Sequence, residues 1–264
     1  MTDPTPPDTP LDRAHAAMAA APDDDALRLR FHERLADAEL FLLLAAEATG
    51  DAIDPRTFDT EDGRFLVAFD REERLADFAG GLAPYAALPG RALAQMLAGQ
   101  DLGLAVNPGA ASETLVAPEA LAWLATMLAA APEPAEARPS AFHPPAGLPE
   151  SLLAGLDAKF AAMAGTARAA WLVGVRYESG EEGHLIAFVD ALPDAEPALA
   201  RAVAETLRFS GLDGGRLDVA FTAASDPLAA RLARVGLRFD LPAPAIPAAR
   251  PAPGSDPDKP PILR

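Results

Sequence analysis

Hydrophobic and polar positions follow a helical rhythm in some parts of the chain and a two-residue alternation in others. Leu27, Phe31 and Leu35 lie four residues apart, which predicts an amphipathic helix over this stretch. Aspartates at 23–25 precede that helix, where negative charge complements the positive end of the helix dipole. Capping is therefore a simpler role for these aspartates than a Ca²⁺ or Mg²⁺ site, which would need further oxygen ligands and a nearby glycine.

The alternation of Phe65, Val67 and Phe69 predicts a strand. Leu93, Met96 and Leu97 are expected to share the buried face of a helix that begins at Pro89 and ends at Gly99. The other elements predicted in the first half are a strand at 40–46, a short helix at 71–78, a strand at 102–106 and a helix that starts at 118–119.

The second half has clearer signals. The predicted elements are a helix at 152–163, strands at 171–177 and 185–189 joined by a hairpin, a helix at 194–209, a strand at 217–221, a helix from 227 and a strand at 237–241. This order mixes a hairpin with crossover connections, so it favours an α+β fold with helices over one face of a small mixed sheet.

Proline-rich stretches divide the chain. We predict a disordered or partly helical tail at 1–22, an α+β domain at 23–130, a Pro-rich linker at 131–148, a second α+β domain at 149–241 and a disordered Pro-rich tail at 242–264. Each domain is expected to be a mixed β-sheet covered by helices.

Charge and composition exclude several classes of protein. The net charge is −17, and residues 1–146 hold 24 acidic against 10 basic side chains, so nucleic-acid binding is not expected. The absence of cysteine excludes disulfides and thiol catalysis. No apolar run is long enough to cross a membrane, and the first residues lack the pattern of a secretory signal, so we expect a cytoplasmic protein without membrane contact.

Recognisable catalytic motifs are missing. The sequence has no nucleophile elbow, His-Glu-x-x-His pair, Walker loop or dinucleotide-binding glycine motif. His184 lies close to Glu181 and Glu182, a combination that suits either a metal corner or the polar rim of a hairpin, and the rim is the simpler interpretation. We therefore predict no catalytic residues, no metal and no cofactor.

One candidate binding site emerges where the strand at 102–106 ends in Asn107, Pro108 and Gly109. Such a turn can leave backbone donors and an amide open to a ligand, although the same residues also suit an ordinary turn. Tyr85 and Arg91 could border the same surface, because aromatic and guanidinium groups are frequent recognition anchors. Packing would explain Tyr85 equally well.

The segment Phe65–Glu73, followed by Leu102–Gly109, resembles the SseB family of bacterial proteins. In that family, a strand is followed by a short acidic segment and then by a helix, and a later short strand ends in Asn-Pro. The resemblance covers roughly residues 25–130, and 149–241 is similar to the family's C-terminal domain. It implies a two-domain cytoplasmic protein, linked by name to enhanced serine sensitivity, with no established catalytic activity or ligand.

The expected function is that of a noncatalytic binding or adaptor protein, whose partner is another protein or a small amino-acid-like ligand. One alternative is a metal-dependent hydrolase or transferase that uses Asp70, Glu72 and Glu113. Another is a secretion-associated chaperone or effector, since a type III secretion translocon component shares the family's name. The long apolar segments expected of that component are absent here.

Overall fold

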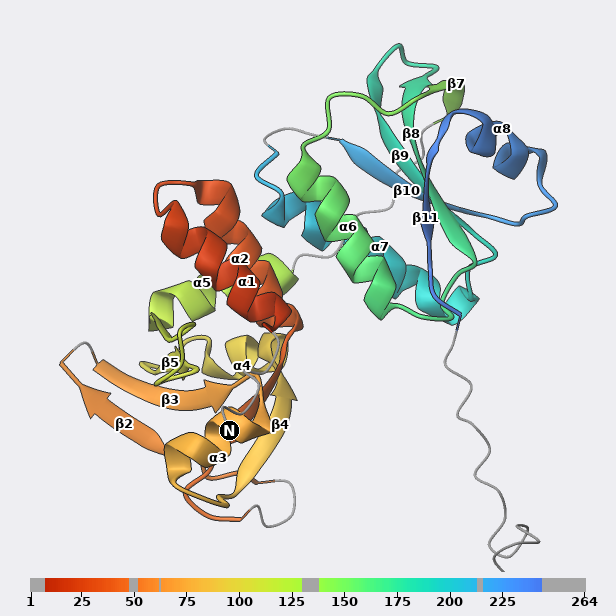
Figure 1. The fold of residues 1–264 in the computed structure, drawn as a ribbon. Helices are drawn as coiled ribbons and strands as arrows, with labels where there is room; N and C mark the ends of the chain where they lie inside the picture. The colour runs from red at the N-terminus through yellow and green to blue at the C-terminus, as the bar shows by residue number, and fades with distance from the viewer. Residues whose placement is uncertain (1–7, 48–51, 62, 130–137, 213–215, 244–264) are drawn as a thin grey trace, which may run out of the picture.

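The protein is described by a computed structural model that covers residues 8–47, 52–61, 63–129, 138–212 and 216–243 (Figure 1). Two layered α+β domains follow one another along the chain, which confirms the predicted fold class. The expectations for residues 1–7 of the first tail, 131–137 of the linker and 244–264 of the second tail fall outside the described residues. No helix of the described part of the chain is long and apolar enough to span a membrane.

The first domain is built around one mixed sheet. Its elements are α1 (Pro10–Ala20), α2 (Asp25–Asp37), β1 (Glu39–Leu43), β2 (Thr57–Thr60), β3 (Gly63–Phe69), α3 (Glu72–Ala79), β4 (Tyr85–Pro89), α4 (Gly90–Leu97), β5 (Gly103–Val106), β6 (Thr114–Val116) and α5 (Pro118–Ala129). The strand order is β4-β1-β3-β5-β6, with β2 paired to β3. Strands β3 and β5 run parallel, and the other pairs are antiparallel.

Successive side chains of each strand point to opposite faces of this sheet, and apolar side chains lie on both faces. Leu66 and Ala68 of β3 face the core formed with α1, α2, α4 and α5. Phe65, Val67 and Phe69 face the opposite side, where Leu75 of α3 covers them. A strand buried on both faces must be apolar at nearly every position, which explains why β1 is apolar at every residue after Glu39.

The first helix was not expected as part of the domain. α1 lies within the predicted tail at 1–22, yet Leu11 is only 2% exposed and packs in the same core as Phe31 of α2. Thr9 caps α1, which is why the helix starts directly after the proline-rich opening. The prediction for Met96 is also wrong, because this side chain is 46% exposed while Leu93 and Leu97 are buried.

The second domain holds a five-stranded mixed sheet. Its elements are β7 (Pro139–His143), α6 (Glu150–Ala162), β8 (Ala169–Tyr177), β9 (Glu182–Val189), a short 3-10 turn (Pro193–Ala195), α7 (Glu196–Phe209), β10 (Leu217–Thr222), α8 (Pro227–Val235) and β11 (Leu237–Asp240). The order is β10-β9-β8-β11, with β7 paired to β8, and only β9 and β10 run parallel.

Two expectations for this domain need correction. β7 lies inside the predicted linker, and it pairs with β8 because Gly174 leaves room for His143, whose ring would lie about 2.0 Å from a Cβ at that position. Helices cover both faces of the sheet rather than one: α6 and α7 pack on one side, and Leu232 of α8 packs on the other.

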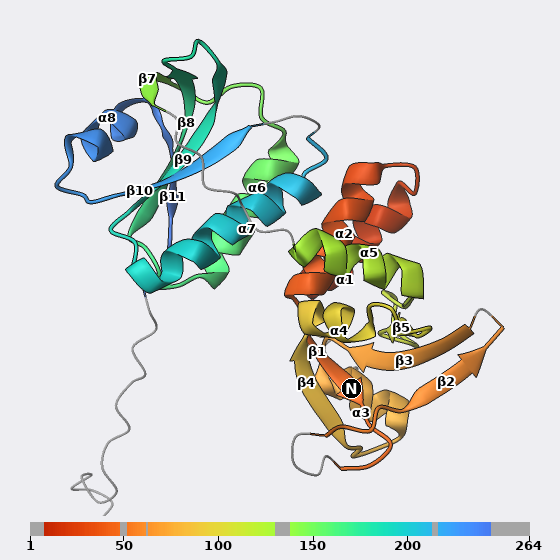
Figure 2. The same ribbon diagram turned by 180° about the vertical axis from the view of Figure 1, so that it is seen from behind.

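The two domains contact each other through helices. In both views, α6 and α7 of the second domain lie beside α2 and α5 of the first (Figures 1 and 2). Trp123 of α5 meets Phe209 of α7 edge to face, with ring centroids 6.1 Å apart. Arg208 Nη1 donates a hydrogen bond to the Met127 carbonyl at 2.8 Å. The contact between Trp123 and Phe209 forms an apolar end of the interface between the domains, and ion pairs form the other end.

Candidate functional site

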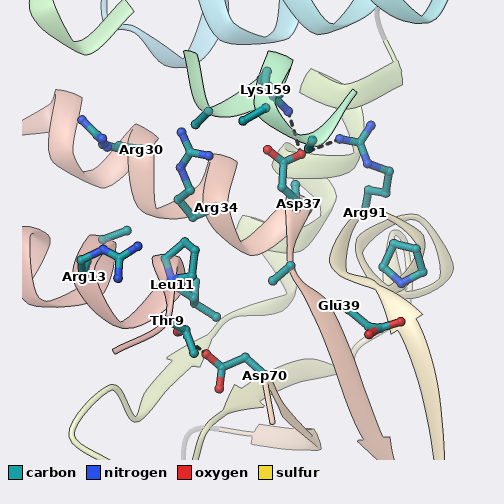
Figure 3. Close-up of a pocket in the computed structure, with 18 of the residues that line it drawn as sticks. Thr9, Leu11, Arg13, Arg30, Arg34, Asp37, Glu39, Asp70, Arg91 and Lys159 are labelled. Atoms are coloured by element: carbon teal, nitrogen blue, oxygen red, sulfur yellow. Dashed lines mark hydrogen bonds and ion pairs between the residues drawn. The ribbon is translucent and has the colours of Figure 1, made fainter. Parts of the chain in front are cut away.

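A cavity of about 1370 Å³ lies between the two domains, and we call it the interdomain cleft (Figure 3). The first domain contributes α1, α2, the start of β1, the residues between β3 and α3, and the start of α4. The second domain contributes α6 and α7. Because both domains line it, the cleft depends on how they are joined.

Helical spacing brings charged side chains of α2 into the cleft. Leu27, Arg30, Arg34 and Asp37 all line it, at intervals of three or four residues along one face of α2. Phe31 belongs to the face that is buried in the first domain's own core. α2 is therefore apolar toward its domain and charged toward the cleft.

Arg13 of α1 joins Arg30 and Arg34 on the same wall, and we call these three residues the arginine cluster (Figure 3). Arg13 Nη1 donates to the Asp8 carbonyl at 2.7 Å. Neither Arg13 nor Arg30 forms an ion pair with a carboxylate in the described part of the chain. In a chain with 39 acidic side chains, two arginines without a carboxylate partner beside a third are unusual.

Arg34 is the member of the arginine cluster that most needs a hydrogen-bond acceptor. Its side chain is 11% exposed, and its Nη2 lies 3.7 Å from Glu33 Oε2, beyond hydrogen-bond range. This Nη2 is buried and has no hydrogen-bond partner. A buried donor without an acceptor costs about 1–3 kcal/mol, and more when the donor is charged.

Glu33 lies behind the arginine cluster, at the junction of the domains. Its carboxylate is buried, Oε1 has no hydrogen-bond partner, and a Cβ added at Gly155 of α6 would lie 3.8 Å from Oε2. Burial raises the pKa of the Glu33 carboxyl, and the nearby cations Arg34 and Lys159 offset this only in part. A carboxyl group whose ionisation is disfavoured therefore lies where the two domains meet.

Four charged residues form an ionic cluster that closes one end of the cleft. Lys159 Nζ of α6 donates to Asp37 Oδ1 at 2.7 Å and to Glu205 Oε2 at 3.1 Å. Arg91 of α4 donates to both oxygens of Glu205 at 3.2 Å and to Asp37 Oδ1 at 2.7 Å. Two cations and two anions neutralise one another here, and their ion pairs join the two domains. None of these ion pairs involves the arginine cluster.

The remaining walls combine small apolar and acidic side chains. The apolar ones include Ala14 and Ala17 of α1, Ala158, Ala161 and Ala162 of α6, and Ala202 of α7. Their short side chains leave space where longer residues would fill the cleft. Glu39 and Glu72 line the cleft on the side toward β1 and α3, and neither forms an ion pair with a described basic residue.

The predicted site residues occupy three different environments, and only Arg91 lines the cleft. Asn107 is fully buried and has a positive φ of 51°. Its Oδ1 accepts from the Asp70 amide at 3.0 Å, and its Nδ2 donates to Ser112 Oγ at 3.1 Å. The amide predicted to be open to a ligand is therefore used inside the protein.

Beyond the buried amide, the turn continues into Pro108, which is partly buried, and Gly109, which is exposed. The Gly109 amide donates to Glu113 Oε2 at 2.6 Å. Tyr85 lies elsewhere, on β4, with its ring 5.4 Å from that of Phe41. A hydrogen bond with Glu72 raises the pKa of the Tyr85 hydroxyl.

Asn107 belongs to a larger polar group, the Asp12 network, which fastens α1 to the sheet. Arg74 donates to both oxygens of Asp12 at 2.8 Å and to Asp70 Oδ1 at 2.7 Å, while Ser112 Oγ donates to Asp12 Oδ1 at 2.5 Å. Burial alone would raise the pKa of the Asp12 carboxyl, but the hydrogen bonds from Arg74, Ser112 and Thr9 outweigh it and hold this pKa far below its usual range.

The carboxylates of the hydrolase alternative are engaged separately. Asp70 binds Arg74, Glu113 binds the Gly109 amide, and Glu72 acts on the Tyr85 hydroxyl, whose pKa it raises. Among the described residues, no three His, Cys, Asp or Glu side chains converge on a position that could hold a metal ion.

The other two acidic motifs have local roles. Asp24 caps α2 through hydrogen bonds to the Ala26 and Leu27 amides, as expected for the aspartates at 23–25. His184 Nε2 lies 3.0 Å from the Ala146 carbonyl. Glu181 pairs with Arg216. The His184 corner is thus part of the hairpin's polar rim.

Apart from Arg91, and from Asp70 and Glu72 of the hydrolase alternative, sequence reasoning missed the residues that line the cleft. Arg30 and Arg34 carried a signal, because they fall on one face of a predicted helix that is distinct from the face of Phe31 and Leu35. Lys159 and Glu205 carried none, since Lys159 lies 122 residues from its partner Asp37 and Glu205 lies 114 residues from its partner Arg91.

Comparison with known proteins gives one match. The family model described as the SseB protein N-terminal domain matches residues 11–123. No curated protein and no solved structure matches the chain. The matched span begins with α1 and ends within α5, so it includes the arginine cluster and Arg91. It stops before the second domain, whose similarity to the family's C-terminal domain stays a prediction. Over residues 11–123 the chain is therefore similar to the N-terminal domain of SseB proteins.

Proposed function

We propose that this protein is a noncatalytic, two-domain binding protein of the SseB type, and that it holds a small carboxylate-bearing ligand in the interdomain cleft. The observation that carries the proposal is the side chain of Arg34, which lines the cleft and whose buried Nη2 lacks an acceptor. A bound carboxylate would supply that acceptor. It would also neutralise the repulsion between Arg30 and Arg34, which lie four residues apart on α2.

The other walls of the cleft favour an amino-acid-like ligand. Alanines of α1, α6 and α7 suit a short aliphatic group. Glu39 and Glu72, which have no cationic partner among the described residues, suit an ammonium group. A molecule with a negative end, a short apolar body and a positive end therefore complements the cleft better than a purely apolar one.

Binding can be tested by calorimetric titration of the full chain with L-alanine, L-glutamate, succinate and inorganic phosphate. Propylamine, which has no anionic group, serves as the counter-probe. Replacement of Arg34 by methionine keeps the length of the side chain and removes its donors. Because a hydrogen bond to a charged group contributes about 1.5–3 kcal/mol, Arg34→Met is expected to weaken binding roughly ten- to hundredfold.

Arg28→Met is the matched control. Arg28 lies on the same helix, pairs with Asp25 and is exposed, and it does not line the cleft. This variant is expected to bind as the unaltered protein does. The proposal fails if none of the four compounds that carry an anionic group binds, or if Arg34→Met and Arg28→Met bind equally well.

A further inference from the structure

A second surface lies at the edge of the first sheet, on β4 (Figure 1). β4 pairs antiparallel with β1, and no other described strand pairs with it. The Leu44 amide donates to the Pro84 carbonyl at 2.9 Å, and the Gly90 amide donates to the Ala38 carbonyl at 2.8 Å. These two bonds fix which residues of β4 turn their backbone groups toward β1.

In an antiparallel ladder, alternate residues of a strand face the same neighbour. Since Pro84 and Gly90 face β1, Ala86 and Leu88 do so as well, and the backbone groups of the residues between them point away from the sheet. The outward groups are the amides and carbonyls of Tyr85 and Ala87 and the carbonyl of Pro89. No described backbone group forms a hydrogen bond with these outward amides.

The side chains around this edge define what could pair with it. Tyr85, Ala87 and Pro89 are exposed on one face of β4. Glu39 of β1 and Glu72 of α3 are also exposed, lie close enough to act on the Tyr85 hydroxyl, and have no cationic partner among the described residues. The face is therefore acidic.

On the opposite face of β4, Ala86 and Leu88 pack against the core of the first domain. A strand added beside β4 would place every second side chain next to the carboxylates and the others next to this apolar border. Pro84 and Pro89 have no amide hydrogen, so the pairing would be limited to the short stretch between them.

We propose that β4 is a docking edge for a protein partner, which adds a short extended segment with alternating basic and apolar residues to the first sheet. Backbone hydrogen bonds to Tyr85 and Ala87 hold the segment, and Glu39 and Glu72 select its basic side chains. This mode of recognition combines main-chain pairing with side-chain specificity. Glu39 and Glu72 also line the interdomain cleft, so the two proposals share these carboxylates, whereas the backbone pairing at Tyr85 and Ala87 belongs to the docking edge alone.

The experiment measures fluorescence anisotropy of a labelled peptide that alternates lysine and valine, titrated with the full chain. A peptide that alternates glutamate and valine is the counter-probe. Ala87→Pro removes one outward amide hydrogen and keeps the charge of the protein, so it is expected to weaken binding about tenfold or more. Ala87→Val keeps the amide hydrogen and is expected to bind within about threefold of the unaltered protein.

Two further measurements separate pairing from general electrostatic attraction. Methylation of alternate amide nitrogens along one edge of the lysine peptide is expected to abolish binding to the unaltered protein, and it tests pairing even if Ala87→Pro does not fold. The double substitution of Glu39 and Glu72 by glutamine is expected to lower the affinity for the lysine peptide. It should also make that affinity less sensitive to salt concentration. The proposal is overturned if the lysine peptide does not bind, if the glutamate peptide binds as well, or if neither Ala87→Pro nor the methylated peptide reduces binding.

Discussion

At the residue scale, two ionisable side chains each have a buried polar atom without a hydrogen-bond partner. Arg34 has a buried nitrogen without an acceptor, and Glu33 has a buried oxygen without a donor. Groups of this kind lower stability, and they persist at sites that bind something. Asn107 shows the opposite case, because every polar atom of its side chain amide is used inside the Asp12 network.

Replacement of Glu33 by glutamine is expected to raise the free energy of unfolding at neutral pH. The folded state holds the pKa of Glu33 above its ordinary value of 4.5, so the folded protein binds this proton more tightly than the unfolded chain does. The contribution of Glu33 to stability is thus fully present below pH 4.5 and is lost as the pH rises through the folded pKa. Glu33→Gln removes that loss.

Urea denaturation across the pH range measures this effect. The advantage of Glu33→Gln should shrink as the pH falls toward 4.5. Glu119→Gln on the exposed side of α5 is the control and should change stability by less than about 0.5 kcal/mol. A constant difference between the Glu33→Gln variant and the unaltered protein at all pH values would contradict this account.

At the element scale, α1 depends on one threonine at its start. Thr9 Oγ1 accepts a hydrogen bond from the Asp12 amide at 3.0 Å and donates one to Asp70 Oδ2 at 2.5 Å. Asp12 in turn accepts from the Thr9 amide at 2.8 Å, which completes a capping box. The cap therefore sets both the beginning of α1 and its attachment to β3, and α1 carries Arg13 to the cleft.

Thr9→Ala is expected to lower the free energy of unfolding by about 1–2 kcal/mol, because it removes the cap and leaves Asp70 with one partner fewer. Thr9→Ser keeps the hydroxyl and should retain most of the stability. Urea denaturation followed by circular dichroism gives both values. If alanine and serine at this position behave alike, the hydroxyl is not what holds α1.

At the scale of the whole molecule, the ionic cluster and the Trp123–Phe209 contact hold the domains together from two ends. Lys159 and Arg91 each touch carboxylates of both domains, Asp37 of the first and Glu205 of the second. Glu205 is 2% exposed, so without Lys159 its charge would be buried with a single cation.

Lys159→Met is expected to lower the free energy of unfolding by about 3 kcal/mol, the usual effect of removing one partner from a buried ion pair. The domains should also separate more readily, which small-angle scattering would register as a larger radius of gyration. Lys159→Arg preserves the charge and should retain the compact arrangement. An unchanged radius and stability in Lys159→Met would mean that Lys159 is not needed to hold the domains together.

Several elements could be predicted from the sequence because their signals are local. The spacing of Leu27, Phe31 and Leu35, and the alternation of Phe65, Val67 and Phe69, depend on neighbours along the chain and on which face is buried. β4 and β7 escaped prediction because short, proline-bordered strands have little pattern of their own. They are strands only because β1 and β8 offer edges to pair with.

The sequence by itself determined the α+β class, most helix boundaries and the cap at Asp24. The tertiary structure alone decided that Arg13, Arg30 and Arg34 share one cavity, that Asn107 is buried, and that Lys159 joins the two domains. The physical reason is range. Periodicity and capping act within a few residues, whereas desolvation and the pairing of charges depend on which distant segments of the chain meet.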